Sequence, residues 1–194
     1  MHKPTNATTE QSIETEFCEL CEKFNLSDLV KQAFELAKTS HRGQVRKYSG
    51  HPYLIHPFRM MRALIFAGVS DDVVLATALL HDVVEDTSAT LEQLRRSLGL
   101  EVAVRVDALT KDPTNPNGRL DKLEKASLPD AFLVKVADRL DNLTHGFVGA
   151  QTHTIERYRR EHSSLISKTE AAGISSPLLD ELKAFRFANP QDES

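Results

Sequence analysis

Residues 71–87 read DDVVLATALLHDVVEDT, and this stretch decides how the rest of the chain is interpreted. Residues 73–80 are apolar on almost every face of a helix, which predicts a central, buried helix. The helix then acquires His81, Asp82, Glu85 and Asp86 within six positions. Burying such groups without partners costs several kcal/mol, and a divalent metal would offset that cost. The sequence therefore predicts a metal site inside an apolar helix.

Helical spacing extends this site. Residues four apart share a helix face, so His81 and Asp82 form one rung, and Glu85 and Asp86 form an acidic rung one turn later. Such an acidic pair is suited to orient a metal-bound water or to take its proton.

Two further side chains complete the expected metal shell. Asp138 lies on a second helix, in VKVADRLDNL (134–143), with Asn142 one turn further on, and His41 ends a third helix. We expect His41, His81, Asp82 and Asp138 to meet around one cation. Mixed nitrogen and oxygen ligands suit Mn²⁺, Fe²⁺ or Zn²⁺.

Simpler interpretations exist for each residue alone. A His-Asp dipeptide is more often a surface pair, and Asp138 could pair with Arg139 or Arg42. His56 is interpreted as a structural residue at the start of its helix. The combination of polar residues inside an apolar helix favours the metal site.

Composition and charge limit the classes of function. The 194 residues suit one domain, expected over 11–188 with flexible ends at 1–10 and 189–194. The net charge of −4 argues against a nucleic-acid-binding protein. Residues 36–70 contain no acidic side chain, and residues 63–94 contain no Lys or Arg. Adjacent cationic and anionic segments are what a site needs to bind polyphosphate and metal side by side. Composition alone favours the simpler interpretation, which is chance and solvated helix faces.

The chain also lacks the apolar runs of a membrane span or a secretory signal, so we expect a cytoplasmic protein without a membrane partner. Cys18 and Cys21 have C-x-x-C spacing, but no second pair follows, which excludes a four-cysteine zinc site within one chain. They are expected to be reduced thiols on an amphipathic helix.

The periodicity is helical almost throughout and shows no convincing alternating β pattern. We expect an all-α bundle of eight to ten helices, with an ordered loop at 43–57 and a mobile loop at 111–118. Ser27, Ser70 and Thr90 are expected N-caps. The predicted helices cover 11–24, 28–41, 58–67, 71–85, 91–99, 102–110, 118–127, 129–143, 151–172 and 176–188.

Three motifs carry a family resemblance. In order, HRGQVRKYSGHPYLIHP (41–57), ALLHDVVEDT (78–87) and VKVADRLDNL (134–143) closely resemble the hydrolase domain of the RelA/SpoT homologues, a branch of the HD-domain phosphohydrolases. The resemblance spans about residues 28–170. The length implies a stand-alone small alarmone hydrolase without the synthetase and regulatory domains.

The resemblance implies roles for particular residues. His41, His81, Asp82 and Asp138 match metal ligands, usually of Mn²⁺, and Glu85 and Asp86 match the catalytic acidic pair. Arg46, Lys47 and Asn142 match substrate contacts. The implied reaction converts guanosine 3′,5′-bis(diphosphate), or its pentaphosphate, to GDP or GTP and pyrophosphate, which would end or tune the stringent response.

Two alternatives remain open at this point. The first is an HD-type phosphohydrolase that acts on another nucleotide, such as an adenosine alarmone, NADPH or a monophosphate. The second is a nucleotide-binding module without turnover. The segment around residues 48–51, Thr144-His145 and the 111–122 loop depart from the family pattern and bear on substrate choice. A homo-oligomer is compatible with the sequence.

Overall fold

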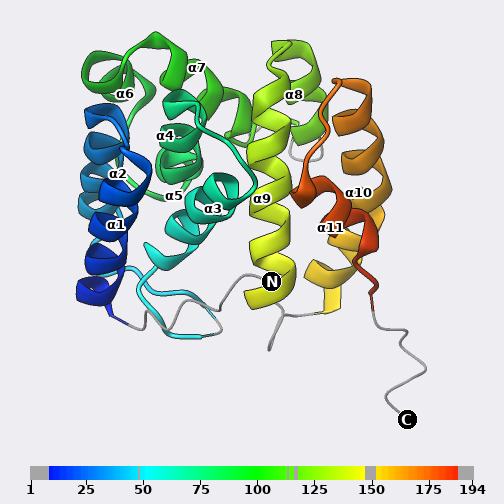
Figure 1. Cartoon of the computed structure of the whole chain (residues 1–194). Helices are drawn as coiled ribbons and strands as arrows, with labels where there is room; N and C mark the ends of the chain where they lie inside the picture. Colours follow the sequence, from blue (N-terminus) through cyan, green and yellow to red (C-terminus); the bar gives the residue numbers. More distant parts are fainter. Residues whose placement is uncertain (1–8, 48, 113, 116–117, 147–151, 188–194) are drawn as a thin grey trace.

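The computed structural model describes residues 9–47, 49–112, 114–115, 118–146 and 152–187, and the ends expected to be flexible fall almost entirely outside this range. The predicted all-α bundle is confirmed. The described residues form ten helices of eight or more residues and the one-turn α5, without a strand (Figure 1).

Apart from the helix predicted over 71–85, the helices begin and end within four residues of the predicted positions. In chain order they are α1 (Glu10–Phe24), α2 (Asp28–Ser40), α3 (Ile55–Phe66), α4 (Asp72–Leu80), α5 (Val83–Asp86), α6 (Leu91–Leu98), α7 (Leu100–Leu109), α8 (Arg119–Ala126), α9 (Pro129–His145), α10 (Thr152–Ala171) and α11 (Pro177–Ala184).

Helix α4 is the buried centre of the molecule, as the apolar run predicts. Every residue from Val74 to Leu80 is buried, and α4 packs against α2, α3, α7 and α9. Its N-cap is Asp71 rather than the predicted Ser70, because the Asp71 carboxylate accepts hydrogen bonds from the backbone N–H groups of Val73 and Val74. Thr90 caps α6 as predicted, in a capping box with Gln93.

The expectation of one helix over 71–85 is wrong. Helix α4 ends at Leu80, and α5 starts at Val83. Asp82, the N-cap of α5, has φ −118° and ψ 0°, which differ from the values of a regular α-helix, and its carbonyl accepts the N–H groups of Glu85 and Asp86 to start α5. The backbone thus changes direction at the His-Asp dipeptide, which turns both side chains toward the neighbouring helices.

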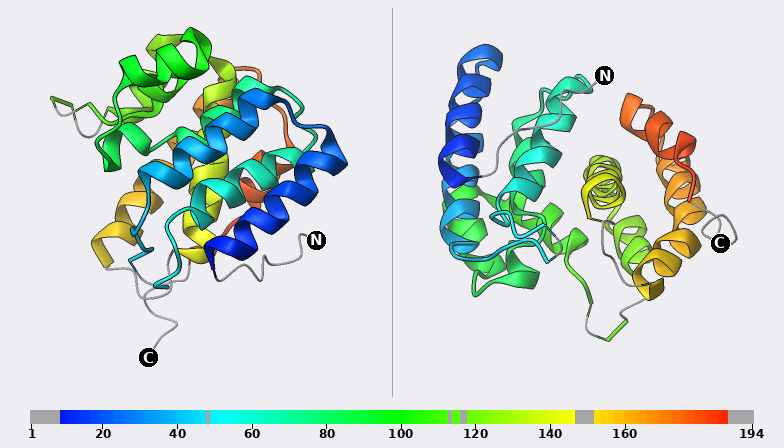
Figure 2. Two further views of the ribbon diagram at one scale, coloured as in Figure 1. Left: turned by 90° about the vertical axis from the view of Figure 1, so that its left-hand side faces the viewer. Right: turned by 90° about the horizontal axis from the view of Figure 1, so that it is seen from below.

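Helix α9 forms the second wall of the site. Figure 1 shows it standing between α1–α7 on one side and α8, α10 and α11 on the other, and the view from below shows it end-on between the same two groups (Figure 2). It packs against α3, α4, α10 and α11. Residues 131–132 and 134–141 are all buried, and they include the charged Lys135, Asp138, Arg139 and Asp141.

A short hairpin-like loop connects α2 to α3 and carries two residues of the site, Arg46 and Tyr53. Val45 and Pro52 form an isolated antiparallel bridge, and the N–H of Tyr53 donates to the carbonyl of Gln44 at 2.9 Å. This pairing holds Arg46 and Tyr53 at the site described below. None of the described helices combines the length and apolar character that a membrane crossing requires.

Candidate active site

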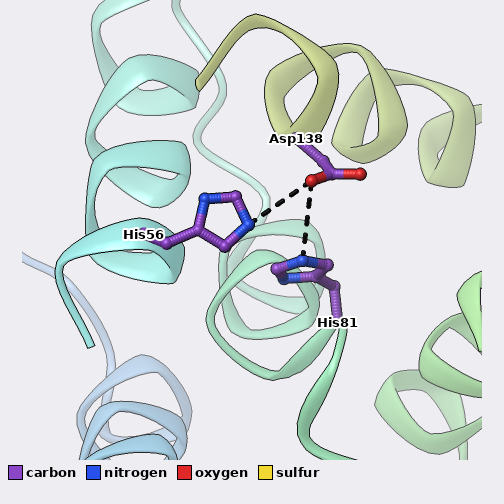
Figure 3. A group of neighbouring side chains, drawn as sticks. All are labelled: His56, His81 and Asp138. Atoms are coloured by element: carbon purple, nitrogen blue, oxygen red, sulfur yellow. Dashed lines mark ion pairs between the residues drawn. The ribbon is translucent and has the colours of Figure 1, made fainter. Parts of the chain in front are cut away.

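Three buried side chains from three elements converge beside α4. His56 lies in the first turn of α3, His81 follows α4, and Asp138 lies in the middle of α9 (Figure 3). His56 Nε2 is 3.4 Å and His81 Nε2 is 3.9 Å from the same Asp138 oxygen, Oδ1. One donor atom from each residue lies within 4.8 Å of the others, which is the arrangement of a metal-binding cluster.

The hydrogen bonds at Nδ1 of His56 and His81 are those expected of metal-binding histidines. His56 Nδ1 lies 2.7 Å from Asp141 Oδ2, and His81 Nδ1 lies 3.0 Å from the carbonyl oxygen of Ala78. Because each acceptor takes a proton from Nδ1, each Nε2 can present its lone pair to the cluster. The donor set of two imidazoles and a carboxylate suits a divalent transition metal.

Burial and charge act differently on the two rings. Burial lowers the pKa of His81, which favours the neutral, ligating form. Burial also opposes charge on His56, but hydrogen bonds to Asp138 and Asp141 outweigh it and raise its pKa to about 9. A cation bound here would replace the proton that His56 Nε2 shares with Asp138.

Asp82 lies at the edge of this cluster. Its Oδ2 accepts a hydrogen bond from the Tyr53 hydroxyl at 2.6 Å and lies 3.5 Å from His81 Nε2. Its Oδ1 lies 3.3 Å from His41 Nε2. Burial alone would raise the pKa of Asp82, but the neighbouring imidazoles hold it well below its usual range. Asp82 is therefore a carboxylate that faces both the cluster and His41.

His41 lies outside the three-residue cluster, contrary to the expectation that it meets His81 and Asp138. Its Nδ1 donates to Gln44 Oε1 at 2.8 Å, and its ring stacks on Tyr53 with centroids 4.7 Å apart. His56 occupies the place expected for His41. Helix α2 ends at Ser40, one residue before His41. From there the His41 ring contacts Asp82, with Nε2 3.3 Å from Oδ1.

Glu85 and Asp86 line a cavity that adjoins the cluster. Asp86 Oδ2 accepts a second hydrogen bond from Tyr53 at 3.1 Å, and Glu85 Oε2 accepts the backbone N–H of Lys111 at 3.1 Å. Burial and then the charge of Asp82 raise the pKa of Asp86. A carboxyl group with a raised pKa is suited to exchange a proton during a reaction.

Asp138 is held by two neighbours on its own helix. Lys135 Nζ donates to Oδ2 at 2.6 Å, and Asn142 Nδ2 donates to Oδ1 at 2.6 Å. Burial opposes ionisation, but the charge of Lys135 and the hydrogen bond from His56 keep the pKa of Asp138 far below its usual value. The group therefore stays an anionic oxygen donor.

Basic side chains line the same cavity as the cluster. Its volume is ≈ 420 Å³, large enough for phosphate groups. The three cluster residues line this cavity together with Asp82, Glu85 and Asp86. Five cationic side chains line it as well: Arg46, Lys111, Lys135, Arg139 and Arg157. The structure thus brings an acidic, metal-binding cluster and five cationic side chains together around one cavity.

Arg46 joins this cavity to a second one of ≈ 140 Å³, which Lys47 and Asn142 also line. Arg46 Nη2 donates to Asn142 Oδ1 at 2.9 Å, so these two predicted substrate contacts touch each other. Gly146 leaves room for this contact, because a Cβ there would lie 3.3 Å from Arg46 Nη2 and 2.8 Å from the carbonyl oxygen of Asn142.

The structure therefore gathers every predicted site residue around the two cavities, with His41 one step removed. Sequence reasoning missed His56, Tyr53, Lys135 and Asp141. One signal was available for His56, since it interrupts the apolar run YLIHPF just as His81 interrupts its own. The other three become recognisable only through contacts between distant segments.

Comparisons with known proteins agree with this geometry. The family model described as "HD domain" matches residues 33–167. Guanosine-3′,5′-bis(diphosphate) 3′-pyrophosphohydrolase of Aquifex aeolicus is 33% identical over 171 residues, which cover 84% of this chain and 23% of that protein. Guanosine-3′,5′-bis(diphosphate) 3′-pyrophosphohydrolase MESH1 of Homo sapiens is 44% identical over 118 residues, 58% of this chain and 66% of that protein. The chain thus spans less than two thirds of these curated relatives.

A solved structure reported under the words "A metazoan ortholog of SpoT hydrolyzes ppGpp and plays a role in starvation responses" superposes with a TM-score of 0.65 at 29% identity. The match covers 80% of this chain and 94% of that one. The residues that the HD-domain family model matches, 33–167, include His56, His81 and Asp138. The chain belongs to the HD-domain family and resembles, within it, the hydrolases of the RelA/SpoT homologues.

Proposed function

We propose that this protein is a metal-dependent pyrophosphohydrolase that removes the 3′-pyrophosphate of guanosine 3′,5′-bis(diphosphate) or its pentaphosphate. The observation that supports this most strongly is the single cavity shared by the metal-binding cluster, the Glu85-Asp86 pair and five cationic side chains. The relatives named for this activity support the choice of substrate. We also propose a cytoplasmic location.

His56, His81, Asp82 and Asp138 would hold the metal, and His41 would support Asp82 from behind. We propose Mn²⁺, which accepts mixed imidazole and carboxylate ligands. A divalent metal at such a site supplies a water of lowered pKa and screens the charge of the phosphate under attack.

The acidic pair would handle protons. Glu85 and Asp86 lie one turn beyond the ligand Asp82, and both line the cavity. Asp86, whose pKa burial raises, would exchange a proton with the attacking water or the departing 3′-oxygen. The Tyr53 hydroxyl, 2.6 Å from Asp82 Oδ2 and 3.1 Å from Asp86 Oδ2, would hold the two carboxylates next to each other.

The five cationic side chains that line the larger cavity would bind the polyphosphate. Arg139 is anchored by Glu161 at 2.5 Å, so its guanidinium is fixed at the cavity wall. Arg46 and Asn142 lie where the two cavities meet, and Lys47 lines the smaller one. We propose that the 3′-pyrophosphate occupies the larger cavity and that the smaller one receives another part of the nucleotide. Addition of one water then yields GDP or GTP and pyrophosphate.

Product analysis tests this proposal. Purified protein with Mn²⁺ is incubated with guanosine tetraphosphate, an adenosine alarmone, NADPH and nucleoside monophosphates, and ³¹P NMR identifies the products. We expect equimolar GDP and pyrophosphate from guanosine tetraphosphate. Orthophosphate release, with preference for another nucleotide, would instead support an HD-type phosphohydrolase of different specificity. Tight nucleotide binding without any product would support a binding module.

A further inference from the structure

Asp141 is a buried carboxylate that the proposed reaction does not use directly. It lies on α9, and only 5% of its side chain is exposed. Its Oδ2 accepts the hydrogen bond from His56 Nδ1 at 2.7 Å, and it is not among the residues that line the larger cavity. Any influence of Asp141 on the reaction must therefore pass through its neighbours.

Those neighbours explain how the buried charge is tolerated. Arg46 Nη2 lies 3.8 Å from Oδ2, and His145 Nδ1 lies 3.1 Å from Oδ1. Burial opposes ionisation, but hydrogen bonds from His145 and His56 keep the pKa of Asp141 well below its usual value. Asp141 is thus an anion whose shortest contact is with His56.

The His56 ring lies between two carboxylates of the same helix. Asp141 contacts Nδ1, and Asp138, one turn away on α9, faces Nε2. An imidazole can expose either nitrogen, and the hydrogen bond at one nitrogen sets which of the two is left to bind a metal. A ring flip would replace the short contact to Asp141 with a carbon atom.

We infer that Asp141 is a positioning residue that fixes the His56 ring with its proton on Nδ1 and the lone pair of Nε2 aimed at His81 and Asp138. This inference rests on the metal site of the proposed function. Carboxylate partners of this kind orient metal-bound histidines and raise their basicity. The affinity for the metal should therefore depend on Asp141, although Asp141 does not touch the metal.

Direct metal binding tests the inference without substrate. Isothermal titration calorimetry with Mn²⁺ is carried out on the wild-type protein, Asp141→Leu and Asp141→Asn. Loss of a carboxylate partner typically weakens metal binding about 10–100-fold, and we expect Asp141→Leu to fall in this range. Asp141→Asn retains an acceptor oxygen but loses the charge, so we expect about 10-fold. Asp130→Asn changes an aspartate at the other end of α9, which pairs with Arg105, and should bind Mn²⁺ like the wild type.

A separate NMR experiment tests whether the His56 proton lies on Nδ1. In ¹⁵N-labelled, Zn²⁺-loaded protein, the NMR signal of a hydrogen-bonded His56 Nδ1–H should appear in the wild type and disappear in Asp141→Leu. A purely structural role would lower the melting temperature and leave both readouts unchanged.

The outcomes separate this inference from the proposed function. Wild-type metal affinity in folded Asp141→Leu overturns it, and if that variant does not fold, wild-type affinity in Asp141→Asn overturns it equally. A wild-type protein that binds Mn²⁺ but releases no pyrophosphate would refute the proposed substrate and leave the role of Asp141 intact.

Discussion

The proposal that His56, rather than His41, is a metal ligand gives a prediction from two matched substitutions. In His56→Asn, the amide can still donate to Asp141 from near the position of Nδ1, but Nε2 is lost. In His41→Asn, the donor to Gln44 is kept in the same way, and the Nε2 that faces Asp82 is lost. Each variant therefore removes only the nitrogen in question.

The expected size follows from ligand linkage. At a Mn²⁺ concentration of 100 times the wild-type dissociation constant, binding stabilises the folded state by about 2.7 kcal/mol. Loss of a direct ligand should exceed the roughly 10–100-fold effect of a supporting residue. If the His56→Asn dissociation constant rises about 100-fold, only about 0.4 kcal/mol of this stabilisation remains at the same Mn²⁺ concentration.

The assay is the melting temperature of each variant with and without Mn²⁺, so that any instability of the metal-free variant cancels. At roughly 2–4 °C per kcal/mol for a chain of this size, His56→Asn should lose about 5–9 °C of the metal-induced shift. His41→Asn, which acts through Asp82, should weaken binding at most about tenfold and lose about 3–5 °C. A larger loss in His41→Asn than in His56→Asn would refute the ligand assignment.

Further predictions concern the cavity and the core. Arg46→Ala should raise KM about tenfold or more and change kcat little in steady-state kinetics, because Arg46 binds rather than reacts; an unchanged KM would contradict this. Asp86→Asn should lower kcat by about 10²–10⁴-fold while calorimetry shows Mn²⁺ binding retained, and near-normal turnover would remove Asp86 from proton transfer. Gly146→Ala should also raise KM, since its Cβ would lie 2.8 Å from the carbonyl oxygen of Asn142 and 3.3 Å from Arg46 Nη2 and would disturb the contact between these two residues; wild-type kinetics would show that this contact is dispensable. Leu79→Ala in the fully buried α4 should lower the free energy of unfolding by about 2–5 kcal/mol in urea, and a loss below about 1 kcal/mol would contradict a tightly packed centre.

The helical fold was largely predictable because local signals agree along the chain. The apolar run at 73–80 predicts the buried α4, and Thr90 with Gln93 predicts the start of α6. The break at Asp82 was not predictable, because the apolar pattern continues through Val83 and Val84. The carboxylate that lies at the break is held by Tyr53 and His41, which come from other segments.

The site was predictable in its residue types and only partly in its partners. His81, Asp82, Glu85 and Asp86 lie within six positions of one another, so they stay together even though the helix breaks at the His-Asp dipeptide. His56 and Asp141 are 85 positions apart, and no local pattern connects them. From the sequence, His41 is predicted as the second histidine and His56 is interpreted as structural, because only the packing of α3 against α9 brings the His56 ring to Asp138.

The central claim is that a divalent metal bound by this cluster supports pyrophosphate hydrolysis in the adjoining cavity. The most direct test is anomalous diffraction at the manganese edge from crystals of the active protein soaked in Mn²⁺. We predict one peak within bonding distance of His56 Nε2, His81 Nε2, Asp82 and Asp138. A peak bound by His41 without His56, or no peak at the cluster in crystals that hydrolyse the substrate, would contradict the account.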